Sequence, residues 1–168
     1  MKTNWINGQI LGEAVVAMGI ITVSILAFTG VLARSMNEGR YISNKITAVN
    51  LAGEGIEIAR NILDGNAIIR ANTWNQGFNA HGFFEADFRS EALTAVNVNN
   101  LRVLREEQIG GVTFYSYNSS GAVTNFRRSI QIEPMGLHQI RVTARVFWDA
   151  RAGRINEVVL VSDFYNWR

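Results

Sequence analysis

The strongest constraint on this chain is an apolar run close to its N-terminus. Twenty consecutive uncharged residues, most of them apolar, extend from Ala14 to Ala33. As a helix that rises about 1.5 Å per residue, they would span roughly 30 Å, which is the thickness of the hydrocarbon core of a bilayer. The run therefore predicts a membrane-spanning helix, and the rest of the chain is what this helix carries.

A single carboxylate, Glu13, lies at the N-terminal edge of the run. A charged side chain at the edge of a membrane span is costly, and such residues mark functional positions by default. The alternative is that the side chain extends to the lipid headgroups and has no further role.

Two ordinary kinds of N-terminal segment also contain an apolar run. A cleaved secretory signal has an apolar region of about 7–15 residues and ends at small residues, for which Val31–Ala33 is an acceptable site. An uncleaved signal anchor would keep the whole run in the membrane. The run is longer than the first alternative requires, and Glu13 interrupts its start.

The residues before the run resemble a known processing motif. Gly8 is followed by Gln9-Ile10-Leu11-Gly12-Glu13 and then by the apolar run, which is similar to the N-terminal motif of type IV pilins and type II secretion pseudopilins. The resemblance implies that residues 1–8 are a leader, that a prepilin peptidase cuts between Gly8 and Gln9, and that Gln9 becomes an N-methylated mature N-terminus. It also implies an assembly role for Glu13. Many members of the family have Phe or Met at the position of Gln9.

The physical chemistry of Glu13 agrees with that role. A carboxylate in lipid needs a partner. Cleavage would create an α-amino group with a pKa near about 8, which could pair with Glu13 of a neighbouring subunit. Such a pair would be satisfied in one register only, and so would select that register at some cost in stability.

Two criteria disagree about the side of the membrane on which residues 34–168 lie. Lys2 precedes the apolar run, whereas Arg34, Arg40 and Lys45 follow it. The positive-inside rule alone would therefore place the C-terminal part in the cytoplasm. The resemblance implies the opposite, and we follow it because the charge difference is small. We expect a single-pass protein of the cytoplasmic (inner) membrane with an extracytoplasmic C-terminal domain, later incorporated into a filament.

Helical periodicity continues beyond the apolar run. Apolar residues recur at spacings of three and four on one predicted face: Ile42, Ile46, Val49, Ala52, Ile56, Ala59 and Leu63. The opposite face carries Arg40, Asn44, Lys45, Glu54, Glu57 and Arg60. Asp64-Gly65-Asn66 predicts the end of the helix. Residues 9–33 are thus a transmembrane and assembly segment, and residues 34–64 are its amphipathic continuation. Gly30 and Gly39 would either let the helix bend or allow close packing.

Residues 65–168 predict a loop region followed by an antiparallel sheet. A short strand is expected near residues 83–88, and longer strands at 112–117, 125–133, 140–148 and 155–165. We expect a meander whose apolar face covers the helix. The predicted fold is α+β and pilin-like, with a long N-terminal helix packed on an antiparallel β-sheet. The aromatic residues of the loop region either form a contact surface or cap the core: Trp74, Phe78, Phe83 and Phe84.

The charged residues of this region predict no catalytic site. Glu85 and Asp87 are expected to be solvated, and Glu106-Glu107 to lie in a charged loop. Four arginines are expected to form a solvated strip on the sheet, with a DNA or partner site as the alternative: Arg127, Arg128, Arg141 and Arg145.

Composition argues against several other functions. The chain has no cysteine, which excludes disulfides and thiol chemistry. A net charge of +2 argues against nucleic-acid binding as the main function. The two histidines, His81 and His138, lack metal-ligand spacing, and no catalytic motif occurs. We expect no enzyme activity, no metal site and no cofactor.

These observations together predict a structural minor pilin that is assembled into, primes or caps a type IV pilus-like filament. The stretch at residues 51–62 and the ending Asn166-Trp167-Arg168 also resemble minor pilins. The implied partners are other pilin subunits, the prepilin peptidase, an inner-membrane assembly platform and membrane lipid. A type II secretion pseudopilin is the alternative of the same class. A signal-anchored extracytoplasmic binding domain is the alternative of a different class.

Overall fold

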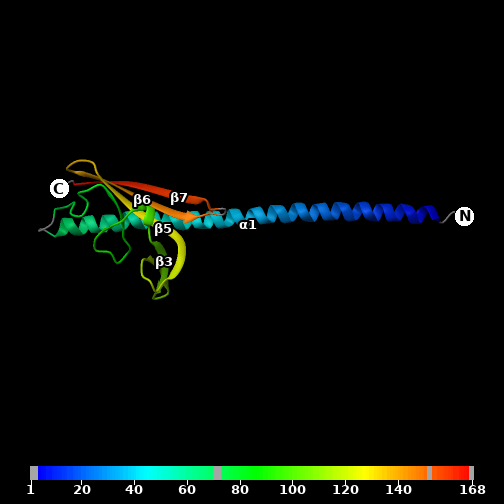
Figure 1. Ribbon diagram of the computed structural model, residues 1–168, viewed down its shortest axis with the longest axis horizontal. Helices are drawn as coiled ribbons and strands as arrows, with labels where there is room; N and C mark the ends of the chain where they lie inside the picture. The colour runs from blue at the N-terminus through cyan, green and yellow to red at the C-terminus, as the bar shows by residue number, and fades with distance from the viewer. Residues whose placement is uncertain (1–3, 70–72, 151–152, 167–168) are drawn as a thin grey trace. The chain divides into compact units, whose positions relative to one another are not determined.

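The computed structural model describes residues 4–69, 73–150 and 153–166, with the side chains described from residue 10 onward. The chain divides into two compact units, Met1–Ser43 and Asn44–Arg168 (Figure 1). The first unit contains the N-terminal part of helix α1 (Asn4–Ile68), and the second contains the rest of α1 and the sheet. The start of the predicted leader, Met1–Thr3, and the Trp167-Arg168 ending lie outside the described residues.

Helix α1 is longer at both ends than the sequence predicted. It begins at Asn4, inside the predicted leader, and ends at Ile68. The predicted stop at Asp64–Asn66 is therefore wrong. The side-chain amide of Asn66 donates to the carbonyl of Gln76 (2.8 Å), and the amide of Ile69 donates to the carbonyl of Gly65 (3.2 Å). Asn66 thus connects the helix to the following loop while the backbone continues through another turn.

The glycines of the apolar half do not interrupt α1. The helix is continuous through Gly30 and Gly39. A Cβ atom added at either residue would meet nothing within 4 Å. Neither glycine therefore marks a break or a close packing contact in the described part of the chain.

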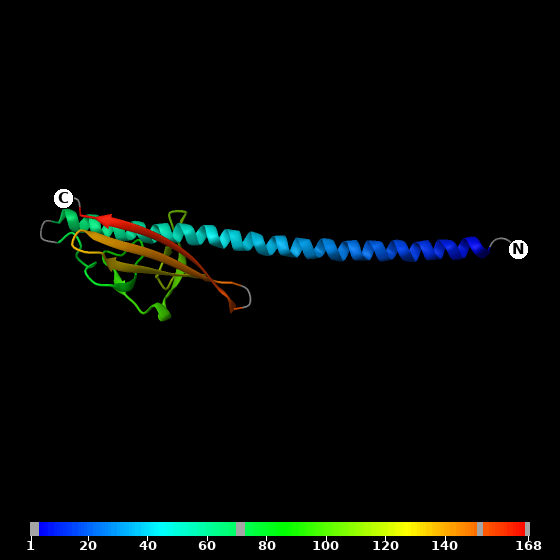
Figure 2. The same ribbon diagram turned by 90° about the horizontal axis from the view of Figure 1, so that it is seen from above.

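Seven strands form one antiparallel sheet (Figure 2). They are β1 (Gly82–Glu85), β2 (Thr94–Ala95), β3 (Val103–Ile109), β4 (Val112–Ser116), β5 (Ala122–Pro134), β6 (Gln139–Asp149) and β7 (Ile155–Tyr165), with a short 3₁₀ helix, η1 (Val98–Asn100), before β3. In both views β6 and β7 run alongside the C-terminal part of α1. The predicted α+β architecture, a long helix packed on an antiparallel sheet, is confirmed.

The predicted meander is correct for β5, β6 and β7 only. The thirteen-residue strand β5 pairs with β6 along one edge, and its other edge is shared by β3 and β1. Val103 of β3 lies opposite Arg127, whereas Phe84 of β1 lies opposite Ile130. A strand of this length has room for two partners along the same edge. β3 pairs with the N-terminal part of β5, and β1 pairs with its C-terminal part.

The charged loop predicted at Glu106-Glu107 is wrong, because both residues lie in β3. Gly110 and Gly111 follow directly, with φ angles of 61° and 83°. Two consecutive residues with positive φ form the tight hairpin turn that glycine favours. This turn folds β3 onto β4 and gives the two glutamates cross-strand partners.

The face of α1 that packs on the sheet begins later than predicted. Ile42, Ile46 and Val49 are exposed. The buried helix residues are Ala48, Leu51, Ala52, Gly55, Ile56, Ile58, Ala59 and Leu63. Four of these eight are Ala or Gly and the other four are Leu or Ile, so the face that packs on the sheet combines small and large side chains.

The sheet contributes the other half of this core. Residues 140, 142, 144, 146 and 148 of β6 are all buried, as their predicted alternation requires. Phe78 is fully buried, while Trp74 and Phe84 pack against the same core. These three aromatic residues therefore cap the core rather than forming a separate contact surface.

A charged side chain lies between α1 and the sheet. Arg128 of β5 is fully buried. Its Nη1 donates to the carbonyl of Leu51 in α1 (3.0 Å), and its Nη2 donates to the carbonyl of Ala86, just after β1 (2.6 Å). The carboxylate of the half-buried Glu54 lies 3.5 Å from Nη1. The prediction that Arg128 belongs to a solvated strip is therefore wrong, and this guanidinium instead connects α1, β1 and β5.

Gly55 provides the space for Arg128. A Cβ atom at Gly55 would lie 3.1 Å from Cδ of Arg128 and 3.3 Å from Cβ of Ala144. Both distances are shorter than carbon atoms prefer, which is about 3.5–4.0 Å. At Gly53, two residues earlier, a Cβ atom would meet nothing within 4 Å. The two glycines therefore have different roles although they lie on the same helix.

This difference predicts opposite effects for the same substitution. Gly55→Ala should lower the free energy of unfolding by about 1–2 kcal/mol, because overpacking displaces Arg128 or Ala144. Gly53→Ala should leave it unchanged or raise it by up to about 1 kcal/mol, because alanine favours a helix. Denaturant unfolding of the full chain in detergent measures both. Equal effects would contradict the packing described for Gly55.

Candidate functional site

The apolar half of α1 is exposed on all sides. Every side chain from residue 10 to residue 43 is exposed, including large ones such as Phe28 (69% exposed). The helix is long and apolar enough to cross a membrane. A helix that is apolar all round requires an apolar environment. This part of α1 therefore indicates a single-pass membrane anchor.

The hydroxyl side chains of the apolar run, Ala14 to Ala33, are satisfied within the helix. The hydroxyl groups of Thr22, Ser24 and Thr29 donate to the carbonyls of Met18 (2.8 Å), Ile20 (2.7 Å) and Leu26 (3.0 Å). Such back-bonding removes the need for water at each hydroxyl. These residues therefore add little cost to placing the helix in lipid, where an unpaired polar group costs several kcal/mol (about 2–7).

The predicted processing and assembly residues all lie in the first turns of α1. Gly8 and Gln9 have helical backbone, and Glu13 follows one turn later. Glu13 is exposed, and among the side chains described from residue 10 onward it has no hydrogen-bond or ion-pair partner. Cleavage between Gly8 and Gln9 and methylation of Gln9 stay predictions.

The acidic pair that was expected to be solvated is part of the folded core. Glu85 is only 1% exposed. It accepts hydrogen bonds from the backbone amide and from Nε of Arg102, both at 2.6 Å. The guanidinium of Arg102 also lies 4.3 Å from the ring centroid of Tyr117. The prediction for Glu85 is wrong because its two acceptor oxygens are needed to order the segment before β3.

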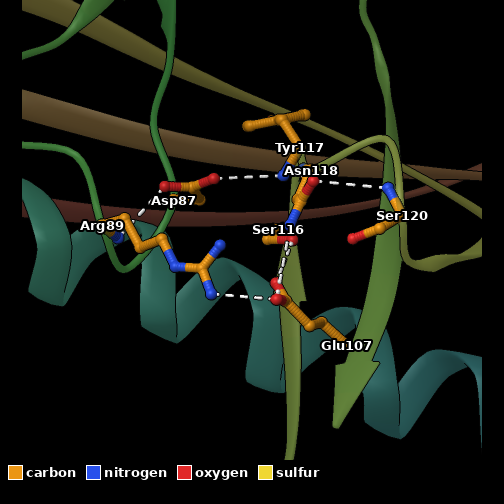
Figure 3. A network of polar contacts seen from close by, with 7 residues as sticks. All are labelled: Asp87, Arg89, Glu107, Ser116, Tyr117, Asn118 and Ser120. Atoms are coloured by element: carbon orange, nitrogen blue, oxygen red, sulfur yellow. Dashed lines mark hydrogen bonds and ion pairs between the residues drawn. The ribbon is translucent and has the colours of Figure 1, made fainter. Parts of the chain in front are cut away.

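Asp87 and Glu107 connect three segments in a polar network (Figure 3). Asp87 accepts from the backbone amides of Arg89 and Tyr117, both at 3.1 Å. Glu107 accepts from Nη2 of Arg89 (2.9 Å) and from the side chains of Ser116 (3.2 Å) and Asn118 (3.3 Å). The hydrogen bond from Arg89 is the main reason why the pKa of Glu107 is lowered. These carboxylates hold the loop after β1 against the β3–β4 hairpin.

The remaining arginines of the predicted strip are each paired with a carboxylate. Arg141 makes a two-pronged contact with Asp163 (2.8 and 3.0 Å), and Arg145 lies 2.9 Å from Glu157. Arg127 lies 3.5 Å from Asp149. Positive charge is thus neutralised across β5, β6 and β7, which gives no support to the DNA-binding alternative.

A pocket of about 320 Å³ lies beside the last turns of α1, within the second unit. Residues of α1, Trp74 and residues 163–166 line it. The guanidinium of Arg60 lies 5.6 Å from the ring centroid of Phe164 and pairs with Glu57 (3.0 Å). Asp163 is paired with Arg141. Two of the charged side chains in the pocket are therefore already engaged, and the pocket does not define a ligand.

Among the described residues, no three His, Asp or Glu side chains gather as a metal site would require. No family model, no curated protein and no solved structure matches the chain. The class that the structure defines is an α+β protein whose N-terminal helix indicates a single-pass membrane anchor.

The ion pair between Arg141 and Asp163 predicts that the free energy of unfolding depends on pH. The hydrogen bonds from Arg141 lower the pKa of Asp163. A carboxyl group whose pKa is lowered on folding stabilises the fold above its unfolded pKa, and this contribution is lost as the pH falls through the folded pKa.

We therefore expect Asp163→Asn to lower the free energy of unfolding at pH 7, with the deficit relative to the unmodified chain shrinking below about pH 4 and disappearing once the pH is below the lowered pKa of Asp163. Urea unfolding across this pH range measures the difference. Asp149→Asn, which removes the longer pair with Arg127, serves as the control and should have a smaller effect at pH 7. A deficit for Asp163→Asn that persists or grows toward low pH would contradict this account of the ion pair.

Proposed function

We propose that this chain is a structural subunit, most similar to a minor pilin, that is cut between Gly8 and Gln9 and incorporated into a type IV pilus-like filament. The observation that carries the proposal is Glu13. It is a carboxylate without a partner among the side chains described from residue 10 onward, and it lies near the start of a helix that is apolar and exposed all round. The packed sheet domain at the other end of the chain is what the filament would display.

The exposed surface of α1 suits two successive environments. In the membrane it would contact lipid, as its length and composition allow. In a filament the same apolar side chains would contact the helices of neighbouring subunits. Because lipid tails and leucine-rich helices are similarly apolar, transfer from one to the other needs no large change in apolar burial.

Glu13 would make that transfer selective. A carboxylate in a membrane segment costs about 2.5–3.5 kcal/mol on insertion scales. An α-amino group on Gln9 of a neighbouring subunit would offset this cost, and methylation of the amine would keep its charge. Subunits would then be held in the one register that pairs the two groups.

Gly8 suits the proposed cleavage site for two physical reasons. It lies within α1, and glycine in a helix is less favourable than alanine by about 1 kcal/mol, so the bond after it can be exposed at low cost. Glycine also has no side chain to obstruct a peptidase at the membrane surface.

The three alternatives differ from the proposal in different ways. A type II secretion pseudopilin would share the cleavage, the methylation and the role of Glu13, and would differ only in the machine that it serves. A signal-anchored extracytoplasmic binding domain would keep its N-terminus. A cleaved secretory signal would be cut near Arg34.

The intact mass of the protein from its native host tests the proposal. We expect the mature protein to lack residues 1–8 and to carry one additional methyl group. Gly8→Val should leave the leader uncut, because a β-branched side chain obstructs the cleavage site. Gly12→Val, the same exchange one turn later, should still be cut. A mature protein that begins at Met1 or near Arg34 would overturn the proposal.

A further inference from the structure

Strand β7 is an edge of the sheet that lacks the usual protection. It has eleven residues and pairs with β6 in an unbroken register, from Ile155 opposite Asp149 to Tyr165 opposite Gln139. It contains no Pro, Gly or Lys. The strands at the other edges are short, with two residues in β2 and five in β4. Proteins protect edge strands by shortness, bulges, Pro or Lys, because an open edge pairs with other chains.

The hydrogen bonds at the two ends of β7 show which of its backbone groups face the open edge. The amide of Asn166 donates to the carbonyl of His138 (2.8 Å), and the amide of Ala150 donates to the carbonyl of Arg154 (2.6 Å). Both pairs continue the β6–β7 register, so even-numbered residues bond toward β6. The odd-numbered residues 155–165 therefore direct their N–H and C=O groups away from β6.

The side chains of these odd-numbered residues favour pairing rather than preventing it. Ile155, Val159, Val161 and Tyr165 are apolar or aromatic and 41–66% exposed. Glu157 and Asp163 are the only charged residues of β7, and each is paired with an arginine of β6. Both carboxylates stay partly exposed (27% for Asp163 and 37% for Glu157), so they still face the side chains of an incoming strand.

The charges argue against a second copy of the chain as the occupant. Antiparallel pairing of two β7 strands with full overlap would place Glu157 of one copy opposite Asp163 of the other, twice. Like charges directly opposite each other destabilise a strand pair. A complementary strand would instead carry basic residues opposite Glu157 and Asp163, and apolar residues opposite Val159 and Val161.

We propose that β7 accepts, by strand addition, an extended segment of a different polypeptide with the alternating pattern basic, apolar, apolar, basic. The backbone ladder would provide affinity, and the alternate side chains would provide specificity. This inference concerns the sheet domain alone, so it holds whether or not the chain is processed and assembled into a filament.

A labelled peptide of sequence Thr-Arg-Thr-Val-Thr-Val-Thr-Arg-Thr is the probe, titrated against the full chain in detergent micelles by fluorescence anisotropy. We expect saturable binding, and binding at least tenfold weaker for a peptide with Glu in place of both Arg. Val159→Pro should abolish binding, because it removes an outward N–H while the ladder to β6 is kept.

Val161→Lys should weaken binding at least tenfold, because it places a positive charge beside the arginines of the peptide. Val112→Lys, the same exchange in the edge strand β4, should not change it. Circular dichroism reports whether Val159→Pro is folded. If it is not, the comparison of Val161→Lys with Val112→Lys still tests the proposal. Absence of saturable binding would overturn the proposal, as would equal binding by the Val161 and Val112 variants. Dimerisation of the chain through β7 without peptide binding would overturn it as well.

Discussion

The buried guanidinium of Arg128 constrains how the sheet domain packs on α1. A charge out of water must have acceptors around it, and Arg128 finds them in Leu51 of the helix and Ala86 after β1. The helix can approach closely because residue 55 has no side chain. A shift of α1 by one residue would remove both the acceptor and the space. Arg128 therefore fixes the register of the helix on the sheet.

The same interaction is costly as well as specific. Arg128 Nε has no hydrogen-bond partner among the described residues. Burial is the main cause of a raised pKa for Glu54, although Arg128 acts to lower it, so the two groups do not fully compensate each other. Buried ion pairs commonly contribute little net stability, but breaking one leaves an uncompensated charge. We interpret this pair as a device that selects one arrangement of helix and sheet, while the apolar core provides most of the stability.

Much of the fold could be predicted from the sequence because its periodic signals are strong. The strand at Ile155–Tyr165 and the α+β class agree with the prediction. Strand β3 was missed because Glu106-Glu107 suggested a loop, although Gly110-Gly111 was available as a hairpin signal. The burial of Arg128 and Glu85 could not be predicted, because it depends on acceptors that come from distant parts of the chain.

The candidate site, like the fold, could be predicted from the sequence only in part. Gly8, Gln9 and Glu13 were identified from a local motif. The structure adds that Glu13 has no partner among the side chains described from residue 10 onward, and that the helix after it is exposed. The role of these residues depends on molecules outside this chain, so neither periodicity nor packing could establish it. The open edge of β7 is the opposite case. Its residues were predicted as a strand, but only the sheet order shows that, among the described strands, none pairs with its outer side.

The most direct test of the central claim compares two adjacent arginines of β5. Arg128→Lys keeps the charge but loses the planar fork that reaches Leu51 and Ala86, and should lower the free energy of unfolding by about 2 kcal/mol. Arg127→Lys, next to it but on the outer face, should lower it by less than about 0.5 kcal/mol, because its pair with Asp149 is long and partly exposed. Denaturant unfolding of both variants in detergent gives the comparison. Equal losses, or a larger loss for Arg127→Lys, would contradict the claim that Arg128 holds α1 on the sheet.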